Sequence, residues 1–595
     1  MKRNEIELKY KWNTDLIYAS VEEFEHAFQS ANELVKSISE RETMMCESAE
    51  ELYKTLEMLT EAEVLISRLY EYAHLNSDVD TADNTFLALS GKCENLYREF
   101  GAATYFVSPK IISLEESTLE KWYVHYPKLE EYRRNIECER RYKPHMLSDN
   151  EEKLFSRFQL CLGSHENTRD VFSYADMSFG ELKNDKGETV TLTDTNYIPL
   201  MMCSNREVRR NAFETLYSTY AAFSNTYAAL LNAYVKEKTT IANIRKFSSS
   251  LEASVFADEV PSSIYNNLIE SVNNNLSVLY DYYALKKKAL GLEELHMYDI
   301  YAPLVSEIKL SYTYEQAVDI VLDTIKVLGE EYTLTLEDGI KNKRWVDAFP
   351  NDNKKGGAYS AGCYGVQPYI LLNFTNTLND VSTLAHEAGH SMHTYFSNKS
   401  NSPQQASYTI FVAEVASTVN ELLLAHKMLK NSESSEQKRY VLNQLMETYK
   451  GTLFRQTMFA EFEKQMHELC EKGEILTAEL LSEKYYELNK KYFGEGVILD
   501  KEIRYEWERI PHFYYNFYVY KYATCICAAS AIVKRIETEG EAYIQKYLKF
   551  LSCGGSKSPL DSLSEAGIDM TSPDVISAAM DDFSDVIKQF EALLE

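Results

Sequence analysis

Glycine and proline are scarce in this sequence, with 21 and 12 occurrences among 595 residues. Both residues are unfavourable inside helices, so their scarcity favours a largely helical chain. The composition, 45% hydrophobic and 26% charged, is typical of an ordered soluble protein. By length, the chain could form two to four domains or one large helical body.

Positive charge is also in deficit, because 62 Lys and Arg residues face 91 Asp and Glu residues, for a net charge of −29. Such a field repels nucleic acid and anionic membranes, and we expect neither as a partner. The longest apolar stretch, at residues 522–533, is too short to span a bilayer. The opening MKRNEIELKYKW contains no apolar core of a signal peptide, so the sequence predicts a cytoplasmic protein.

Cysteine pairs at metal-binding or redox spacing are absent as well. The ten cysteines are scattered, and the closest two, Cys525 and Cys527, have one residue between them where a C-x-x-C pair has two. We therefore expect free thiols in a reducing compartment. The sequence contains no G-x-x-x-x-G-K-S/T run, which leaves a phosphate-binding loop unsupported.

One short run does carry recognisable chemistry. In TLAHEAGHSMH, residues 383–393, His386, Glu387 and His390 form the pattern H-E-x-x-H. On a helix the two imidazoles would lie one turn apart on one face, where they could occupy two corners of a zinc tetrahedron. Glu387 would then act as the general base for an activated water. The alternative interpretation is a solvated helix whose histidines have no function.

The residues before this run predict its setting. Asn379 and Asp380 are good N-cap residues, and several apolar residues that follow them are compatible with a helix. PYILLNF, residues 368–374, is typical of a buried or half-buried strand. We therefore expect a strand, a short turn and a zinc-binding helix in succession, an order that could hold a substrate beside the metal.

A third protein ligand is expected downstream, because two histidines do not complete a catalytic zinc site. Residues 411–429 are apolar on most sides, yet Glu414 and Glu421 belong to a polar stripe at helical spacing. A carboxylate in such a helix is costly unless it is paired or bound to metal. A salt bridge or contact with solvent would also satisfy Glu414, but the upstream motif favours the ligand role. Glu421 is a candidate partner for a ligand imidazole.

A tyrosine-rich segment, PHFYYNFYVYKY at residues 511–522, offers hydrogen-bond donors. An aromatic helix packed in the core is the simplest interpretation for most of its tyrosines. A hydrolase, however, needs donors for the oxyanion of its tetrahedral intermediate. His512 could supply one, and Tyr518 and Tyr522, four residues apart, could face the same side of a helix.

These segments together resemble oligoendopeptidase F, of the thimet-oligopeptidase group of zinc metallopeptidases. The resemblance lies in H-E-A-G-H-S-M-H, A-E-V-A-S-T-x-N-E and H-F-Y-x-x-F-Y-V-Y-K-Y-A, and GAYSAGCYG, PYILLNF and KWNTDLIY are similar too. It therefore touches nearly the whole chain. It implies a mainly α fold, a two-lobed helical ellipsoid with a deep substrate channel and a small β element near the zinc helix.

The resemblance also implies residue roles and an activity. One Zn²⁺ would be held by His386, His390 and Glu414, with Glu387 as the catalytic base. The transition-state donors would be His512, Tyr518 and Tyr522. The substrates would be short peptides, cleaved at internal bonds, because a deep channel excludes folded proteins.

Domain organisation follows from a break in the helical pattern. The apolar periodicity of helices extends over most of residues 15–175 and resumes near residue 205. Between them, Asp185–Gly187 is a turn signal, and the alternating TVTLT that follows is typical of one arm of a hairpin. We place a boundary there, which gives an N-terminal helical domain at 1–195 and a zinc metallopeptidase catalytic domain at 196–595.

Two other classes of protein share parts of this pattern. A non-catalytic helical peptide-binding protein could keep the metal site, but binding alone does not require Glu387. An exopeptidase of the same metal class is the second alternative; the sequence contains no G-x-M-E-N run to hold a free amino terminus. A purely structural zinc is disfavoured, since such sites prefer closed, cysteine-rich shells.

Overall fold

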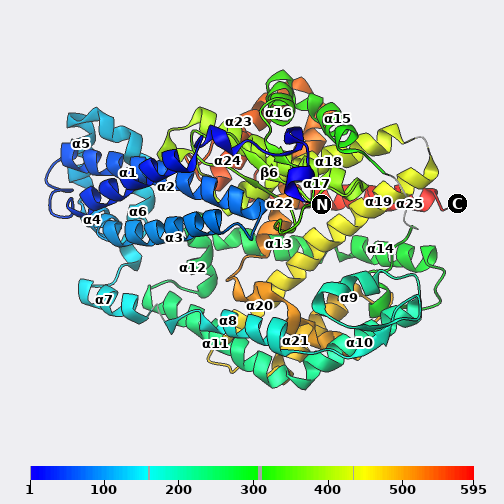
Figure 1. The fold of residues 1–595 in the computed structure, drawn as a ribbon. Coiled ribbons are helices and arrows are strands. Elements are labelled where there is room, and N and C mark those ends of the chain that lie inside the picture. Colours follow the sequence, from blue (N-terminus) through cyan, green and yellow to red (C-terminus); the bar gives the residue numbers. More distant parts are fainter. Residues whose placement is uncertain (1, 159–160, 306–310, 433, 595) are drawn as a thin grey trace. The chain divides into compact units, whose positions relative to one another are not determined.

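The computed structural model describes residues 2–158, 161–305, 311–432 and 434–594. Helices dominate these ranges, and the strands are few and short (Figure 1). This confirms the predicted mainly α class. Within the described ranges, no helix combines the length and the apolarity needed to cross a bilayer.

The chain forms two compact units, and each combines separate segments of the sequence. The first contains Met1–Met146, Leu310–Leu424 and Ile532–Ile568. Its helices are α1 (Val21–Ser39), α2 (Ala49–Val79), α3 (Asn84–Thr104), α4 (Val107–Ser113), α5 (Glu116–His125), α6 (Arg133–Arg140), α15 (Tyr314–Ile325), α16 (Glu330–Lys341), α17 (Leu378–Ser400), α23 (Glu541–Leu551) and α24 (Pro559–Glu565). Most of α18 (Ile410–Asn431) also belongs to it.

The second unit contains Leu147–Lys309, Ala425–Ala531 and Asp569–Glu595. Its helices are α7 (Asp149–Phe158), α8 (Ser164–Val171), α9 (Asp194–Met201), α10 (Arg206–Ala222), α11 (Ser224–Ile244), α12 (Ser250–Ala257), α13 (Ser262–Asn274), α14 (Leu276–Ala289), α19 (Ser435–Thr448), α20 (Arg455–Glu471), α21 (Ala478–Phe493), α25 (Asp574–Ala592) and most of α22 (Tyr520–Glu539). Both units include residues from each side of position 195. The division into 1–195 and 196–595 therefore stays a prediction.

Local sequence signals account for where several helices begin. The side chains of Ser20 and Ser48 each accept a hydrogen bond from a backbone amide three residues on, immediately before α1 and α2. This geometry satisfies one of the otherwise unpaired amides of a first helical turn. The predicted hairpin is also confirmed: β1 (Glu181–Lys183) pairs antiparallel with β2 (Thr189–Thr191).

A three-stranded sheet in the first unit lies before the motif helix α17. The central strand β6 (Tyr369–Leu371) is fully buried and pairs with β4 (Val346–Asp347) in parallel and with β5 (Tyr359–Ala361) in antiparallel orientation. β6 falls within the strand predicted at 368–374. The hydroxyl of Ser360 on β5 lies 2.8 Å from that of Ser391 on α17, which ties the sheet to the motif helix.

The amino-terminal segment packs against the same sheet. The indole of Trp12 meets the ring of Tyr369 edge-on, with centroids 6.0 Å apart, and the Tyr369 hydroxyl donates to the carbonyl of Asn13 at 2.7 Å. A short β3–β7 pair, Leu295–His296 with Val497–Ile498, is the remaining sheet of the described residues and lies in the second unit.

A buried ion pair fixes the loop that follows β4. The ammonium of Lys354 lies 2.8 Å from a carboxylate oxygen of Asp347 and donates to the carbonyl of Leu372 at 2.6 Å. Arg3 pairs with the same carboxylate at 2.7 Å. Because both buried charges have close partners, the cost of removing them from water is offset, and the loop is held against the strands.

Candidate metal centre

The motif helix α17 begins with a reciprocal cap. The side chain of Thr377 accepts from the backbone amide of Asp380, and the Asp380 carboxylate accepts from the amide of Thr377 at 2.8 Å. The expectation that Asn379 or Asp380 would be the N-cap residue was therefore wrong. Thr377 takes that position because it precedes Asp380 by three residues, the spacing of a capping box. Its extended backbone lets its hydroxyl reach the Asp380 amide.

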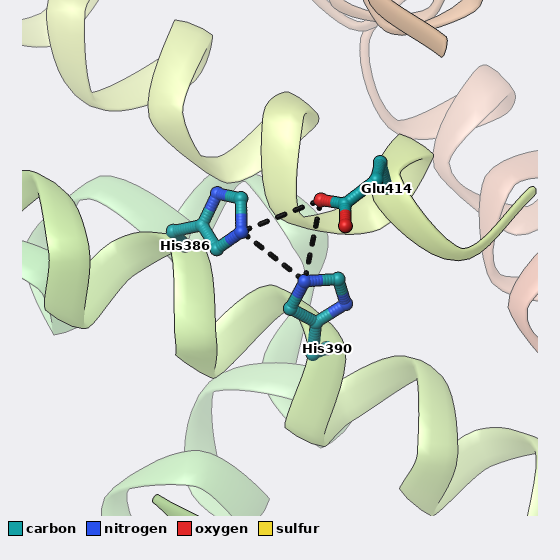
Figure 2. A group of neighbouring side chains, drawn as sticks. All are labelled: His386, His390 and Glu414. Carbon is teal, nitrogen blue, oxygen red and sulfur yellow. Dashed lines mark hydrogen bonds and ion pairs between the residues drawn. The ribbon is translucent and has the colours of Figure 1, made fainter. Parts of the chain in front are cut away.

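Three side chains converge at the middle of α17. The Nε2 atoms of His386 and His390 lie 3.1 Å apart, and each is 3.4 Å from Oε2 of Glu414 on α18. Figure 2 shows the two imidazoles and the carboxylate directed toward a common point. The ligand atoms all lie within 4.8 Å of one another, and this is the metal-type cluster found in the described ranges. The residues expected to hold a metal are thus brought together.

A second glutamate, two turns after Glu414 on the same face of α18, orients the first histidine. The Glu421 carboxylate of α18 accepts a hydrogen bond from Nδ1 of His386, which leaves Nε2 to face the common point. Such a carboxylate–imidazole contact fixes the ring and raises its basicity as a ligand. Ser417, fully buried, donates to the Glu414 carboxylate at 3.1 Å and steadies the third donor.

The charges around the cluster favour a cation. Burial lowers the pKa of His386, but hydrogen bonds to Glu414 and Glu421 outweigh burial and raise this pKa to about 10. Burial raises the pKa of Glu414, yet its contacts with the two histidines hold it well below the ordinary range. The carboxylates thus stabilise positive charge at the point where a metal ion would lie.

Glu387 lies between the two histidines in α17 and is 6% exposed. Burial raises the pKa of its carboxyl, while the neighbouring imidazoles oppose that rise. A less acidic carboxylate is a better proton acceptor, which suits a general base.

The donor set fits a catalytic metal ion. Two imidazoles and one carboxylate are three ligands, which leaves a coordination position for water or substrate, whereas structural zinc sites are closed and rich in cysteine. A mainly helical fold with this site is typical of the metal-dependent hydrolases.

The predicted donors His512, Tyr518 and Tyr522 lie in the second unit and gather there. The ring of His512 lies 6.4 Å from that of Tyr518 and 6.1 Å from that of Tyr522, centroid to centroid, and the two tyrosine rings are 5.3 Å apart. Burial lowers the pKa of His512 and favours its neutral form. Tyr515, which the sequence interpretation missed, is also part of this cluster, 5.4 Å from His512.

The single aromatic helix expected over residues 511–522 was wrong. Pro511–Tyr514 forms a 3₁₀ turn, and α22 begins only at Tyr520. Between them, Asn516 and Phe517 both have positive φ, which interrupts helical geometry. The three-residue spacing of His512, Tyr515 and Tyr518 was the one signal that could have included Tyr515.

Comparisons with known proteins agree with this class. The family model described as peptidase family M3 matches residues 199–582, and a model described as oligopeptidase F matches residues 110–179. Oligopeptidase PepF of Bacillus subtilis is 43% identical over all of this chain and 88% of its own length. Group B oligopeptidase PepB of Streptococcus agalactiae is 36% identical over all of this chain and 98% of its own.

A solved structure supports the same assignment. The crystal structure of oligoendopeptidase-F from Enterococcus faecium has a TM-score of 0.75 and 33% identity, and the match covers 96% of this chain and 99% of that one. This chain belongs to peptidase family M3. It is a metallo-oligopeptidase, and its substrates are peptides.

Proposed function

We propose that the protein cleaves internal bonds of short peptides with one Zn²⁺ held by His386, His390 and Glu414. The observation that carries this proposal is the convergence of three ligand atoms within 4.8 Å, supplied by an H-E-x-x-H helix and a second helix. Imidazole nitrogens with a single carboxylate oxygen suit zinc, since harder ions such as Mg²⁺ prefer all-oxygen ligands. When bound, zinc supplies a Lewis acid that polarises a carbonyl and acidifies water.

Glu387 is proposed as the proton carrier of the reaction. Its carboxylate accepts a proton from the attacking water and passes it to the nitrogen of the leaving amine. The buried position of Glu387 supports this role, because burial makes the carboxylate more basic. Glu421 accepts from Nδ1 of His386, so that Nε2 is left free to bind the metal ion that this site would hold.

His512, Tyr518 and Tyr522 are proposed as hydrogen-bond donors to the oxyanion of the tetrahedral intermediate. The proposal rests on the chemistry of an imidazole and two phenols, on their gathering into one aromatic cluster, and on the family resemblance. Donors of this kind act because negative charge on the carbonyl oxygen grows only in the transition state.

Internally quenched peptides of graded length test the activity. The purified protein is incubated with them, with and without a chelator, and the cut sites are mapped by mass spectrometry. We expect internal cuts in short peptides, lost with chelator and restored by Zn²⁺. Removal of terminal residues alone would make the protein an exopeptidase. Stoichiometric zinc without cleavage at any length would favour a peptide-binding protein.

A further inference from the structure

The chain bends sharply between the 3₁₀ turn Pro511–Tyr514 and α22. Two successive residues in the bend have positive φ, Asn516 at +48° and Phe517 at +61°. Asparagine tolerates this region, whereas a bulky residue such as phenylalanine rarely adopts it. Such outliers persist only where the surrounding structure holds them, and they cluster at functional sites.

A buried carboxyl from α20 lies against this bend. Glu463 is fully buried, and the backbone amide of Phe517 donates to its Oε1 at 2.6 Å. Its Oε2 is buried and has no hydrogen-bond partner among the described residues. Burial raises the pKa of Glu463 to about 8, although the Phe517 amide opposes the rise, so the carboxyl is mainly neutral near pH 7.

Other contacts hold the same two residues. The Phe517 ring lies edge-on to Tyr265, with centroids 5.5 Å apart, and 4.4 Å from the ring of His467. The hydroxyl of Ser254 donates to the carbonyl of Asn516 at 2.7 Å. Helices α12, α13 and α20 therefore all contact the bend, and the Glu463 carboxyl accepts the hydrogen bond of the Phe517 amide.

The bend brings together the two halves of the aromatic cluster. His512 and Tyr515 precede it, and Tyr518 and Tyr522 follow it. The rings nevertheless meet across it, at 6.4 Å for His512–Tyr518 and 6.3 Å for Tyr515–Tyr518. A change in the bend would therefore move the imidazole relative to the two phenols.

We propose that Glu463 is a positioning residue: its carboxyl fixes the Asn516–Phe517 bend and thereby orients His512, Tyr518 and Tyr522 for the reaction. This inference rests on the proposed function, in which those three side chains are donors. Glu463 itself does not touch the substrate. It acts through the backbone, because the left-handed conformation of Phe517 is retained only while its buried amide has an acceptor.

Two variants of Glu463 separate the hydrogen bond from the volume of the side chain. Glu463→Gln keeps a carbonyl acceptor for the Phe517 amide and is close in shape to the neutral carboxyl. Glu463→Met fills a similar volume but leaves the amide buried without an acceptor. Hydrogen exchange followed by mass spectrometry should show faster exchange in peptides covering 512–522 for Glu463→Met, and near wild-type exchange for Glu463→Gln.

Kinetics then connect the bend to the reaction. We expect Glu463→Met to lower kcat roughly 10- to 100-fold, the cost of a small misplacement of reacting groups, with KM and bound zinc near wild type. Glu463→Gln should retain most of kcat. Faster exchange with an unchanged kcat in Glu463→Met would overturn the inference, and so would equal losses in both variants.

Matched controls distinguish this inference from the proposed function. Glu461 lies on the same helix but pairs with Lys491 and Tyr492 and accepts no hydrogen bond from the backbone of Asn516 or Phe517. Glu461→Met should therefore leave exchange at 512–522 and kcat unchanged. His512→Ala and Tyr518→Phe provide the reference: if they lower kcat and Glu463→Met does not, only the positioning role fails. If they leave kcat unchanged, the donor roles fail, and the positioning role fails with them.

Discussion

Gly389 of the motif helix lies directly against the backbone of Ser417 on α18. A Cβ atom added to Gly389 would lie 2.5 Å from the Cα of Ser417 and 2.6 Å from the carbonyl oxygen of Ala416. Real Cβ atoms do not approach backbone atoms so closely, so only glycine permits this approach. Because Glu414 lies one turn before Ser417, the same approach brings its carboxylate to the two histidines.

Gly389→Ala should therefore weaken metal binding. The added methyl group forces α17 and α18 apart and carries Glu414 away from the histidines, with a cost in stability of about 1–3 kcal/mol for overpacking. We expect metal affinity to fall at least roughly tenfold, as it does when the residues that orient a metal ligand are changed. Metal content after dialysis against a competing chelator measures this. Full metal affinity in Gly389→Ala would contradict the role given to the close approach.

Gly451→Ala is the matched control for that substitution. An added Cβ at Gly451 would meet no atom within 4 Å beyond its own helical backbone and chain neighbours, and the φ of Gly451 is not positive. The variant should bind metal as the wild type does and be equally or slightly more stable.

The metal ligands could be predicted from the sequence because their signals are local. His386 and His390 needed only helical spacing, and Glu414 was conspicuous as a charge in an apolar helix. The need for glycine at position 389 has no such local signal, because it arises from the close approach of Ser417, which lies on another helix. The contact of Trp12 with Tyr369 is equally invisible, since it joins distant parts of the chain.

The bend at Asn516 and Phe517 shows a different limit. A sharp change of direction is normally indicated by Gly or Pro, and this segment contains neither between Pro511 and α22. Tertiary contacts, including the buried Glu463 carboxyl, impose a conformation that local propensity opposes. A helix over residues 511–522 was therefore the reasonable prediction from the sequence alone.

Glu421→Ala should reduce metal affinity about 10- to 100-fold while leaving all three ligands in place. The reason is the loss of the hydrogen bond that orients His386 through Nδ1. Glu421→Gln keeps an acceptor and should lose less. Titration with Zn²⁺ in a competing chelator measures both affinities, and identical values for the two variants would argue against an orienting hydrogen bond.

Glu387→Gln should keep the metal and lose turnover. The amide has the size of the carboxylate but cannot accept a proton, and general base catalysis contributes typically 10²- to 10⁴-fold. We expect kcat on a quenched peptide to fall by about that factor, with zinc content measured on the same sample as the control. Near wild-type rates would require another base.

The raised pKa of Glu508 should make the free energy of unfolding depend on pH. Glu508 is 1% exposed, burial raises its pKa from 4.5 to about 8, and the hydroxyl of Ser224 donates to its carboxyl. The folded protein therefore keeps a proton that the unfolded chain releases, so the free energy of unfolding falls as pH rises from about 4.5 to about 8. At about 1.4 kcal/mol per pKa unit, the loss amounts to a few kcal/mol over this window.

Glu508→Gln should remove that part of the pH dependence, because the amide accepts from Ser224 and cannot ionise. Thermal unfolding at pH 5 and pH 8 measures it: the Tm of the variant relative to wild type should rise by a few degrees between the two values. Ser224→Ala is the control, since it leaves a buried carboxyl that still titrates and so retains the pH dependence. If Glu508→Gln and wild type lost the same Tm between pH 5 and pH 8, the carboxyl would already be ionised in the folded protein.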